Sequence, residues 1–144
     1  GGSAGSPGTG GSGGAGGDGG SGGTEPERDF TATIVRTTYG IPHITGDDFG
    51  DLGYGLGYAY AQDNFCVLMR EIVIANGEAA RYWGEGFVNN DFVFSWANSD
   101  EFIETEFLPA TSDTIRDLAK GYAAGMNRYL EETGIDNIEE GPEG

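Results

Sequence analysis

The sequence holds few side chains that could act as a nucleophile or as a general base. His43 is the only histidine and Cys66 the only cysteine among the 144 residues. Beyond the glycine-rich start of the chain, the serines are Ser95, Ser99 and Ser112. A hydrolase of the serine–histidine type needs its base within hydrogen-bond reach of the nucleophile, so His43 is the obvious candidate.

The sequence neighbours of His43 and Cys66 favour structural roles for both residues. His43 lies between Pro42 and Ile44 in a short apolar segment, which is more typical of a structural histidine than of a catalytic one. Cys66 lies in the apolar run of residues 65–69, which favours a core position over a reactive thiolate. A single cysteine also excludes an internal disulfide and a thiolate-cluster metal site.

Several glycine-rich and acidic patterns resemble known motifs without completing them. The G-x-S-x-G matches before residue 24 lack the strand and helix that hold a nucleophile elbow. Residues 53–57 (Gly-Tyr-Gly-Leu-Gly) resemble a dinucleotide loop, but Tyr58 or Tyr60 replaces its third glycine, which favours helix packing. Asp47, Asp48 and Asp51 lack the spacing of a calcium loop. The residues alone therefore predict no catalytic or metal site, and they leave any substrate-binding residues unidentified.

The composition divides the chain in two. Half of the 28 glycines fall in the first 23 positions, and residues 1–24 contain one charged side chain and no large apolar one. We predict a disordered Gly/Ser-rich tether over residues 1–24, either a leash from a lipid anchor upstream of Gly1 or a passive tail. Residues 25–144 form the folding part. Because the chain does not begin with Met, we expect it to start after a processing event or cloning boundary, or to be a fragment.

The charge and the apolar runs exclude two classes of protein. The formal net charge is −17, and the seven basic residues are scattered, which argues against nucleic-acid binding. No apolar run approaches the roughly 18 to 20 residues of a membrane-spanning helix.

The first half of the folding part predicts a hairpin followed by a long helix. Residues 30–36 and 41–45 read as strands around turn residues, and Asp47 and Asp48 are candidate helix caps. The helix should run from about residue 49 to 76, where Gly77 ends it. Gly53, Gly57 and Ala61 recur every four residues on one face, which requires a sheet or second helix packed against the bare backbone.

The second half predicts further helices. A helical turn is expected over residues 78–84, and residues 89–108 favour a helix ended by Pro109. Ser112 should cap an amphipathic helix that closes at Gly134, and the acidic residues 131–144 read as a solvated tail or an interrupted connection.

Longer stretches of sequence resemble one family. Residues 35–44 (Val-Arg-Thr-Thr-Tyr-Gly-Ile-Pro-His-Ile) and 52–64 resemble the opening of the α subunit of penicillin-acylase-type N-terminal-nucleophile hydrolases. Residues 64–66, 76–84 and 121–127 are more similar to the acyl-homoserine lactone and cyclic lipopeptide acylase branch than to penicillin G acylase. The resemblance covers residues 33 to about 130 and is loose over 89–108.

The resemblance implies an α+β fold, with this chain as the amino-terminal, incomplete part of the α subunit. It would be mainly helical, with an N-terminal β-hairpin, within a four-layer αββα core. Family members are zymogens that cleave themselves into α and β subunits, and the first residue of the β subunit, usually Ser, is the nucleophile. Its free amine, with a pKa of about 7.7–8.0, serves as the base. No catalytic residue is then expected here. Arg36, Tyr39, Gly40, Pro42 and His43 match the family motif as scaffold.

The resemblance also implies an activity that this chain would share only within an αβ assembly. The expected enzyme hydrolyses the amide of an N-acyl-homoserine lactone, a lipopeptide or a β-lactam side chain, in quorum quenching or antibiotic metabolism. It would be periplasmic or extracellular and would use no cofactor, although some members bind calcium through a glutamate located beyond Gly144. The alternative is a catalytically inactive, surface-exposed binding module on the same scaffold, whose acidic face meets cations or basic partners.

Overall fold

The structure is a computed structural model that describes residues 28–138, so the predicted tether lies outside the described residues. Its elements, in chain order, are β1 (Thr33–Arg36), β2 (Pro42–Thr45), α1 (Phe49–Ala75), α2 (Ala79–Trp83), the 3₁₀ turn η1 (Glu85–Phe87), α3 (Val88–Ala97), α4 (Asp100–Phe102), the π-helical turn η2 (Ile103–Phe107), α5 (Leu108–Ala110), α6 (Asp113–Thr133) and the 3₁₀ turn η3 (Ile135–Asn137).

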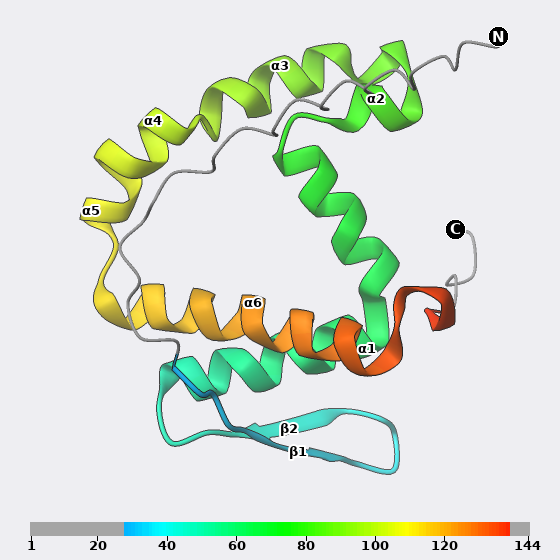
Figure 1. The fold of residues 1–144 in the computed structure, drawn as a ribbon, viewed down its shortest axis with the longest axis vertical. Coiled ribbons are helices and arrows are strands. Elements are labelled where there is room, and N and C mark those ends of the chain that lie inside the picture. Colours follow the sequence, from blue (N-terminus) through cyan, green and yellow to red (C-terminus); the bar gives the residue numbers. More distant parts are fainter. Residues whose placement is uncertain (1–27, 139–144) are drawn as a thin grey trace, which may run out of the picture.

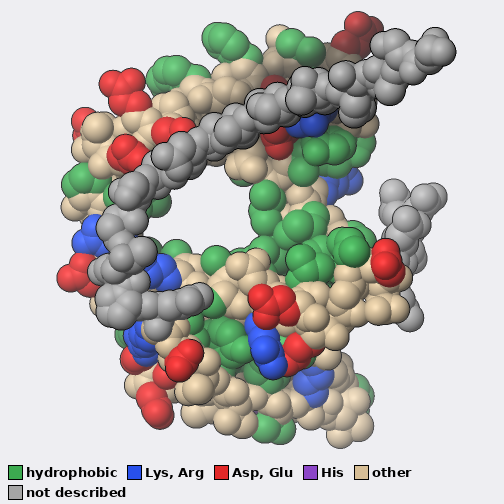
Figure 2. Space-filling model, viewed as in Figure 1, with side chains coloured by type: hydrophobic (Ala, Val, Ile, Leu, Met, Phe, Trp, Pro, Cys, Tyr) green, Lys and Arg blue, Asp and Glu red, His purple; other side chains and the backbone are tan. Residues whose placement is uncertain are grey.

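These elements form an open ring (Figure 1). The first half of α1 lies between α6 and the hairpin, and its second half turns away from both. Helices α2 and α3 and the short segments up to α5 then cross the far side and return the chain to α6. The space-filling view shows that the middle of this ring is open (Figure 2).

The strands pair as the sequence predicts. They are antiparallel, with Ile34 opposite Ile44 and Arg36 opposite Pro42. The turn between them places Gly40 at a φ of +80°, and its amide N–H donates to the carbonyl oxygen of Thr37 at 2.9 Å. A positive φ of this kind is readily adopted by glycine, which explains the residue at that point of the motif.

Gly53 and Gly57 of α1 face Gly121 and Gly125 of α6, and these glycines let the two helix backbones come into contact. A Cβ atom added to Gly57 would lie 2.1 Å from the carbonyl oxygen of Tyr122, and one added to Gly125 would lie 2.0 Å from that of Tyr54. On the opposite face of α1, a Cβ on Gly55 would lie 2.4 Å from the Cγ2 atom of Ile44 in the hairpin. The predicted tertiary partner of the glycine face is therefore confirmed, with a helix on one side and the hairpin on the other.

Helix α1 has nearly the predicted bounds but is not one straight helix. Asp48 caps its start by accepting a hydrogen bond from the amide of Asp51, and Asn76 caps its end. Asn64 has non-helical angles, with φ −146° and ψ 36°, and the helix bends there. The prediction of one continuous helix is therefore wrong at Asn64, although no proline occurs in this stretch.

The helix predicted over residues 89–108 is wrong in its continuity and in its end. Helix α3 stops at Ala97, and the hydroxyl of Ser99 then accepts a hydrogen bond from the amide of Phe102 and starts a new segment. That segment continues through Pro109 to Ala110. Pro109 directly follows the π-helical turn η2, in the first turn of α5, and does not end the segment.

The later helices follow the prediction. Helix α2 forms within residues 78–84, and α6 begins after Ser112, whose hydroxyl accepts from the amide of Ile115 at 3.4 Å. Gly134 caps the end of α6 with a φ of +75°. The carboxyl end of the predicted acidic tail, residues 139–144, lies outside the described residues.

Within the described residues the core is small and lies where α1 bends against α6. Its buried apolar side chains are Ala61, Phe65 and Leu68, and the partly buried residues around them are Met69, Tyr122, Met126, Tyr129, Leu130 and Ile138. By contrast, Phe92 and Trp96 on α3 are each 78% exposed. The ring thus carries much apolar surface that it does not cover itself.

Candidate functional site

The structure gives each candidate nucleophile or base a place in the scaffold. His43 is exposed on β2, opposite Val35. Ser112 and Ser99 cap helices. Ser95 lies against the turn at Gly77, where an added Cβ would lie 2.3 Å from its hydroxyl oxygen.

The prediction that Cys66 belongs to the core is wrong. Its side chain is exposed, whereas the preceding residue, Phe65, is buried against α6. Successive side chains on a helix point about 100° apart, so an apolar run cannot place every member in the core. Only one edge of this part of α1 faces α6.

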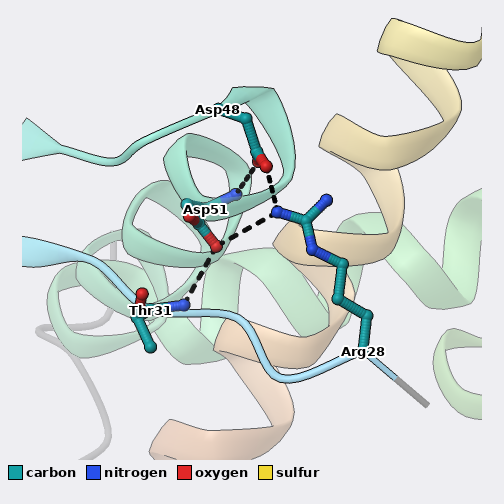
Figure 3. A network of polar contacts seen from close by, with 4 residues as sticks. All are labelled: Arg28, Thr31, Asp48 and Asp51. Carbon is teal, nitrogen blue, oxygen red and sulfur yellow. Dashed lines mark hydrogen bonds and ion pairs between the residues drawn. The ribbon is translucent and has the colours of Figure 1, made fainter.

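An ion-pair network fastens the start of the described chain to the N-terminus of α1 (Figure 3). Asp51, which is 5% exposed, accepts from the backbone amide of Thr31 at 3.0 Å. Arg28 pairs with Asp48 and lies 3.5 Å from Asp51. Hydrogen bonding from the Asp51 amide, and then from Arg28, lowers the pKa of Asp48 below its ordinary value. Since each carboxylate has a protein partner, the acidic residues act as a cap and an anchor.

A second network surrounds Arg36. Its guanidinium donates to the side chain of Gln62 at 2.8 Å and to Asp63 at 3.0 Å, both on α1. It also donates to the carbonyl oxygen of Gly40 at 2.8 Å. Arg36, predicted to be a scaffold residue, thus links the hairpin to α1 through hydrogen bonds.

A third polar group lies between α1 and α6. Tyr58 donates to Glu132 at 2.8 Å, and Arg128 donates to the same carboxylate at 2.7 Å. The hydrogen bond from Tyr58, and then Arg128, lowers the pKa of Glu132, while that carboxylate raises the pKa of the Tyr58 phenol. These shifts have structural partners as their causes.

A shallow depression of about 420 Å³ lies beside Arg28 of the first network and Arg128 of the third. Its lining includes Arg28, Phe30, Tyr54, Asn127 and Arg128. The two arginines already pair with acidic side chains of α1 and α6. The depression therefore offers neither a nucleophile nor an uncommitted guanidinium.

Residues 28–138 also bear on metal binding and on membrane insertion. No three His, Cys, Asp or Glu side chains in this range gather as ligands for a metal ion. None of the helices in the same range is long and apolar enough to cross a bilayer.

Two structural devices escaped the sequence analysis. Asp91 of α3 accepts from the amides of Ala79 and Ala80 at 2.9 and 2.7 Å, and so caps α2 from another helix. No local pattern reveals such a cap, because it depends on how α3 folds back. The second device is the pair Gly121 and Gly125 on α6. Their four-residue spacing, the same as on α1, was the signal that could have identified them.

Residues 28–138 thus combine an antiparallel hairpin with two helices, α1 and α6, that meet through glycines. Residues 31–142 match the penicillin amidase family, and the chain belongs to that family. It is 45% identical over 109 residues to the acyl-homoserine lactone acylase PvdQ of Pseudomonas fluorescens, covering 70% of this chain and 14% of that protein. It is 36% identical over 124 residues to aculeacin-A acylase of Actinoplanes utahensis, covering 79% and 16%.

The fold has a counterpart among solved structures. A thermostable penicillin G acylase from Alcaligenes faecalis matches with a TM-score of 0.62 and 31% identity, over 74% of this chain and 56% of that chain. The predicted fold class, a mainly helical part of an N-terminal-nucleophile hydrolase with a hairpin at its start, is confirmed. The matched relatives are acylases, and this chain spans about one seventh of the length of the curated ones.

Proposed function

We propose that this chain is the amino-terminal portion of the α subunit of an acylase that hydrolyses the amide bond between an acyl chain and a polar amine. Substrates of the acyl-homoserine lactone and lipopeptide type come first, and β-lactam side chains second. The order follows from the sequence identities. They are 45% to PvdQ and 36% to aculeacin-A acylase, compared with 31% to the crystallised penicillin G acylase.

The observation that carries the subunit assignment is the apolar surface that the ring leaves uncovered. Phe92 and Trp96 are 78% exposed, and the buried side chains of the described core are few. Large clustered apolar surfaces on a soluble protein mark contacts with another segment. The opening seen in Figure 2 lies inside the same ring. A β subunit from the same precursor, seated against this ring, would cover surface that the present chain cannot.

The coverage of the relatives also supports a subunit. The matched stretch makes up 56% of the crystallised penicillin G acylase chain but only 14% of the PvdQ sequence. The crystallised chain is therefore much shorter than that full-length sequence, as the α piece of a cleaved precursor would be.

The proposed chemistry takes place on the partner. The hydroxyl oxygen of its first serine attacks the amide carbonyl carbon, and the free α-amine accepts the hydroxyl proton and passes it to the departing amine nitrogen. Water then hydrolyses the acyl ester and regenerates the serine. This chain contributes a wall of the assembly rather than a reacting group, and the mechanism needs no cofactor.

The test uses the full-length gene product that contains this chain. Replacing the serine that begins the β segment by alanine should abolish release of the amine from acyl-homoserine lactone, lipopeptide and penicillin probes. A second variant, His43→Ala, should retain activity because His43 is exposed on β2. Hydrolysis that survives the serine change, or that is lost with His43, would disprove the proposal. A precursor with no such serine would favour the inactive binding module.

We also propose that the assembly works outside the cytoplasm, as a periplasmic or extracellular protein tethered through its glycine-rich start. The composition of residues 1–24 supports a flexible leash. Mass spectrometry of the native protein should find an acyl group on a cysteine upstream of Gly1. An unmodified amino terminus would leave the tether as a passive tail and would contradict the anchor.

A further inference from the structure

The bend in α1 coincides with the place where Arg36 reaches the helix. Its guanidinium contacts Gln62 at 2.8 Å, Asp63 at 2.9 Å and, more loosely, the carbonyl oxygen of Ala59 at 3.5 Å. Asn64, the residue with non-helical angles, follows directly. The contacts of Arg36 on α1 thus fall in the last turn before the bend.

A cation has a physical reason to lie there. A bend at residue 64 ends one helical segment, and the last carbonyl groups of a helix carry a partial negative charge. Asp63 adds a full negative charge to that end, which is unfavourable without a compensating cation. Arg36 supplies the cation from a different element, β1; its side chain is 29% exposed and that of Asp63 is 43% exposed.

Sharp helix bends usually have an identifiable cause: proline, small residues, a π-bulge, or a group inserted into the hydrogen-bond ladder. Proline is absent between Phe49 and Ala75. The glycines of α1 lie before the bend, where α6 and the hairpin hold the helix. In the turn before the bend, the group from another element that reaches the helix backbone is the guanidinium of Arg36, at 3.5 Å from the carbonyl oxygen of Ala59.

We propose that Arg36 is a positioning residue: by capping the first half of α1 at Asp63, it fixes the direction in which the second half leaves the hairpin. That second half forms one side of the ring (Figure 1). The inference rests on the proposed function only for the role of the ring, because the direction of α1 is a property of the scaffold itself.

The test measures the direction of the second half in the full-length gene product. Spin labels on His43→Cys and Glu71→Cys, in a Cys66→Ser background, report the distance from the hairpin to α1 beyond the bend. Position 71 lies roughly 10 Å past the bend at 1.5 Å per residue. A change of about 20° in the bend would therefore move this label by about 4 Å.

Three variants separate the proposed role from a general loss of structure. Arg36→Met should shift or broaden the 43–71 distance, and Arg36→Lys should give an intermediate result because lysine lacks the planar fork. Asp63→Asn, which keeps Arg36, should shift the distance in the same direction. The matched control is Arg81→Met, at a side chain that is 73% exposed, and it should leave the distance unchanged.

A second pair of labels, at His43→Cys and Leu56→Cys, spans only the hairpin and the first half of α1. Its distance should stay constant in every variant. An unchanged 43–71 distance in Arg36→Met, or an equal change in the 43–56 distance, would overturn the proposal. These distances need no turnover, so failure of the acylase assay and failure of the positioning role are distinguishable.

Turnover adds a separate readout. With an acyl-amide substrate, Arg36→Met should raise KM and leave kcat unchanged, because it moves a wall of the assembly and no reacting group. A fall in kcat at constant KM would contradict the positioning role.

Discussion

Adding one methyl group at Gly57 tests the contact on which the α1–α6 pair depends. The Cβ of Gly57→Ala would lie 2.1 Å from the carbonyl oxygen of Tyr122, and that oxygen is backbone, so it cannot rotate away. Overpacking costs about 1–3 kcal/mol, and a clash with backbone belongs at the upper end. Alanine returns about 1 kcal/mol of helix propensity. The net loss should be about 2 kcal/mol.

The loss is read by amide hydrogen exchange in the full-length gene product, residue by residue along α1 and α6. A loss of about 2 kcal/mol should speed exchange in these two helices about 30-fold. The control is Gly86→Ala, because nothing lies within 4 Å of a Cβ at that position. Its effect should stay within about 0.5 kcal/mol. If amide exchange in α1 and α6 were equally slow in Gly57→Ala and Gly86→Ala, the close approach at Gly57 would not limit the packing of these helices.

Three further predictions concern the acidic side chains. Asp91→Ala should cost about 0.5–2 kcal/mol and speed amide exchange at the start of α2, which it caps; normal protection there would contradict the cap. Asp51→Ala should cost about 1–3 kcal/mol, because it removes the acceptor of the Thr31 amide, whereas exposed Asp47→Ala should change the unfolding midpoint little. The lowered pKa of Asp48 gives stability that is complete above about pH 4 and is lost as pH falls through the folded value. Thermal unfolding below about pH 4 should therefore show a smaller acid-induced loss for Asp48→Asn than for the parent, and equal losses would exclude the ion-pair network as a contributor.

Local chemistry let the sequence predict most elements. Ser112 and Gly134 mark the ends of α6 because a hydroxyl cap and a glycine stop act on their own neighbours. Asp48 marks the start of α1 for the same reason. The family resemblance was available from residues 35–44 and 52–64, and the match over residues 31–142 confirms it.

That this chain holds no catalytic residue stays a prediction, whereas the structure shows that Ser99 and Ser112 cap helices. The position of Cys66 was wrong because hydrophobicity shows that a segment is apolar and not which side of a helix meets a partner.

The sequence by itself determined the hairpin, the ends of α1 and α6, and the need for a partner at the glycine face of α1. Those properties arise from backbone conformations and capping groups within a few residues of one another. Only the tertiary structure decided that α6 meets α1 through glycines of its own, that Asp91 caps a different helix, and that α1 bends where Arg36 reaches it. Each of these three features depends on residues that are far apart in the sequence. The helix and strand propensities of single segments do not indicate which distant residues will be in contact.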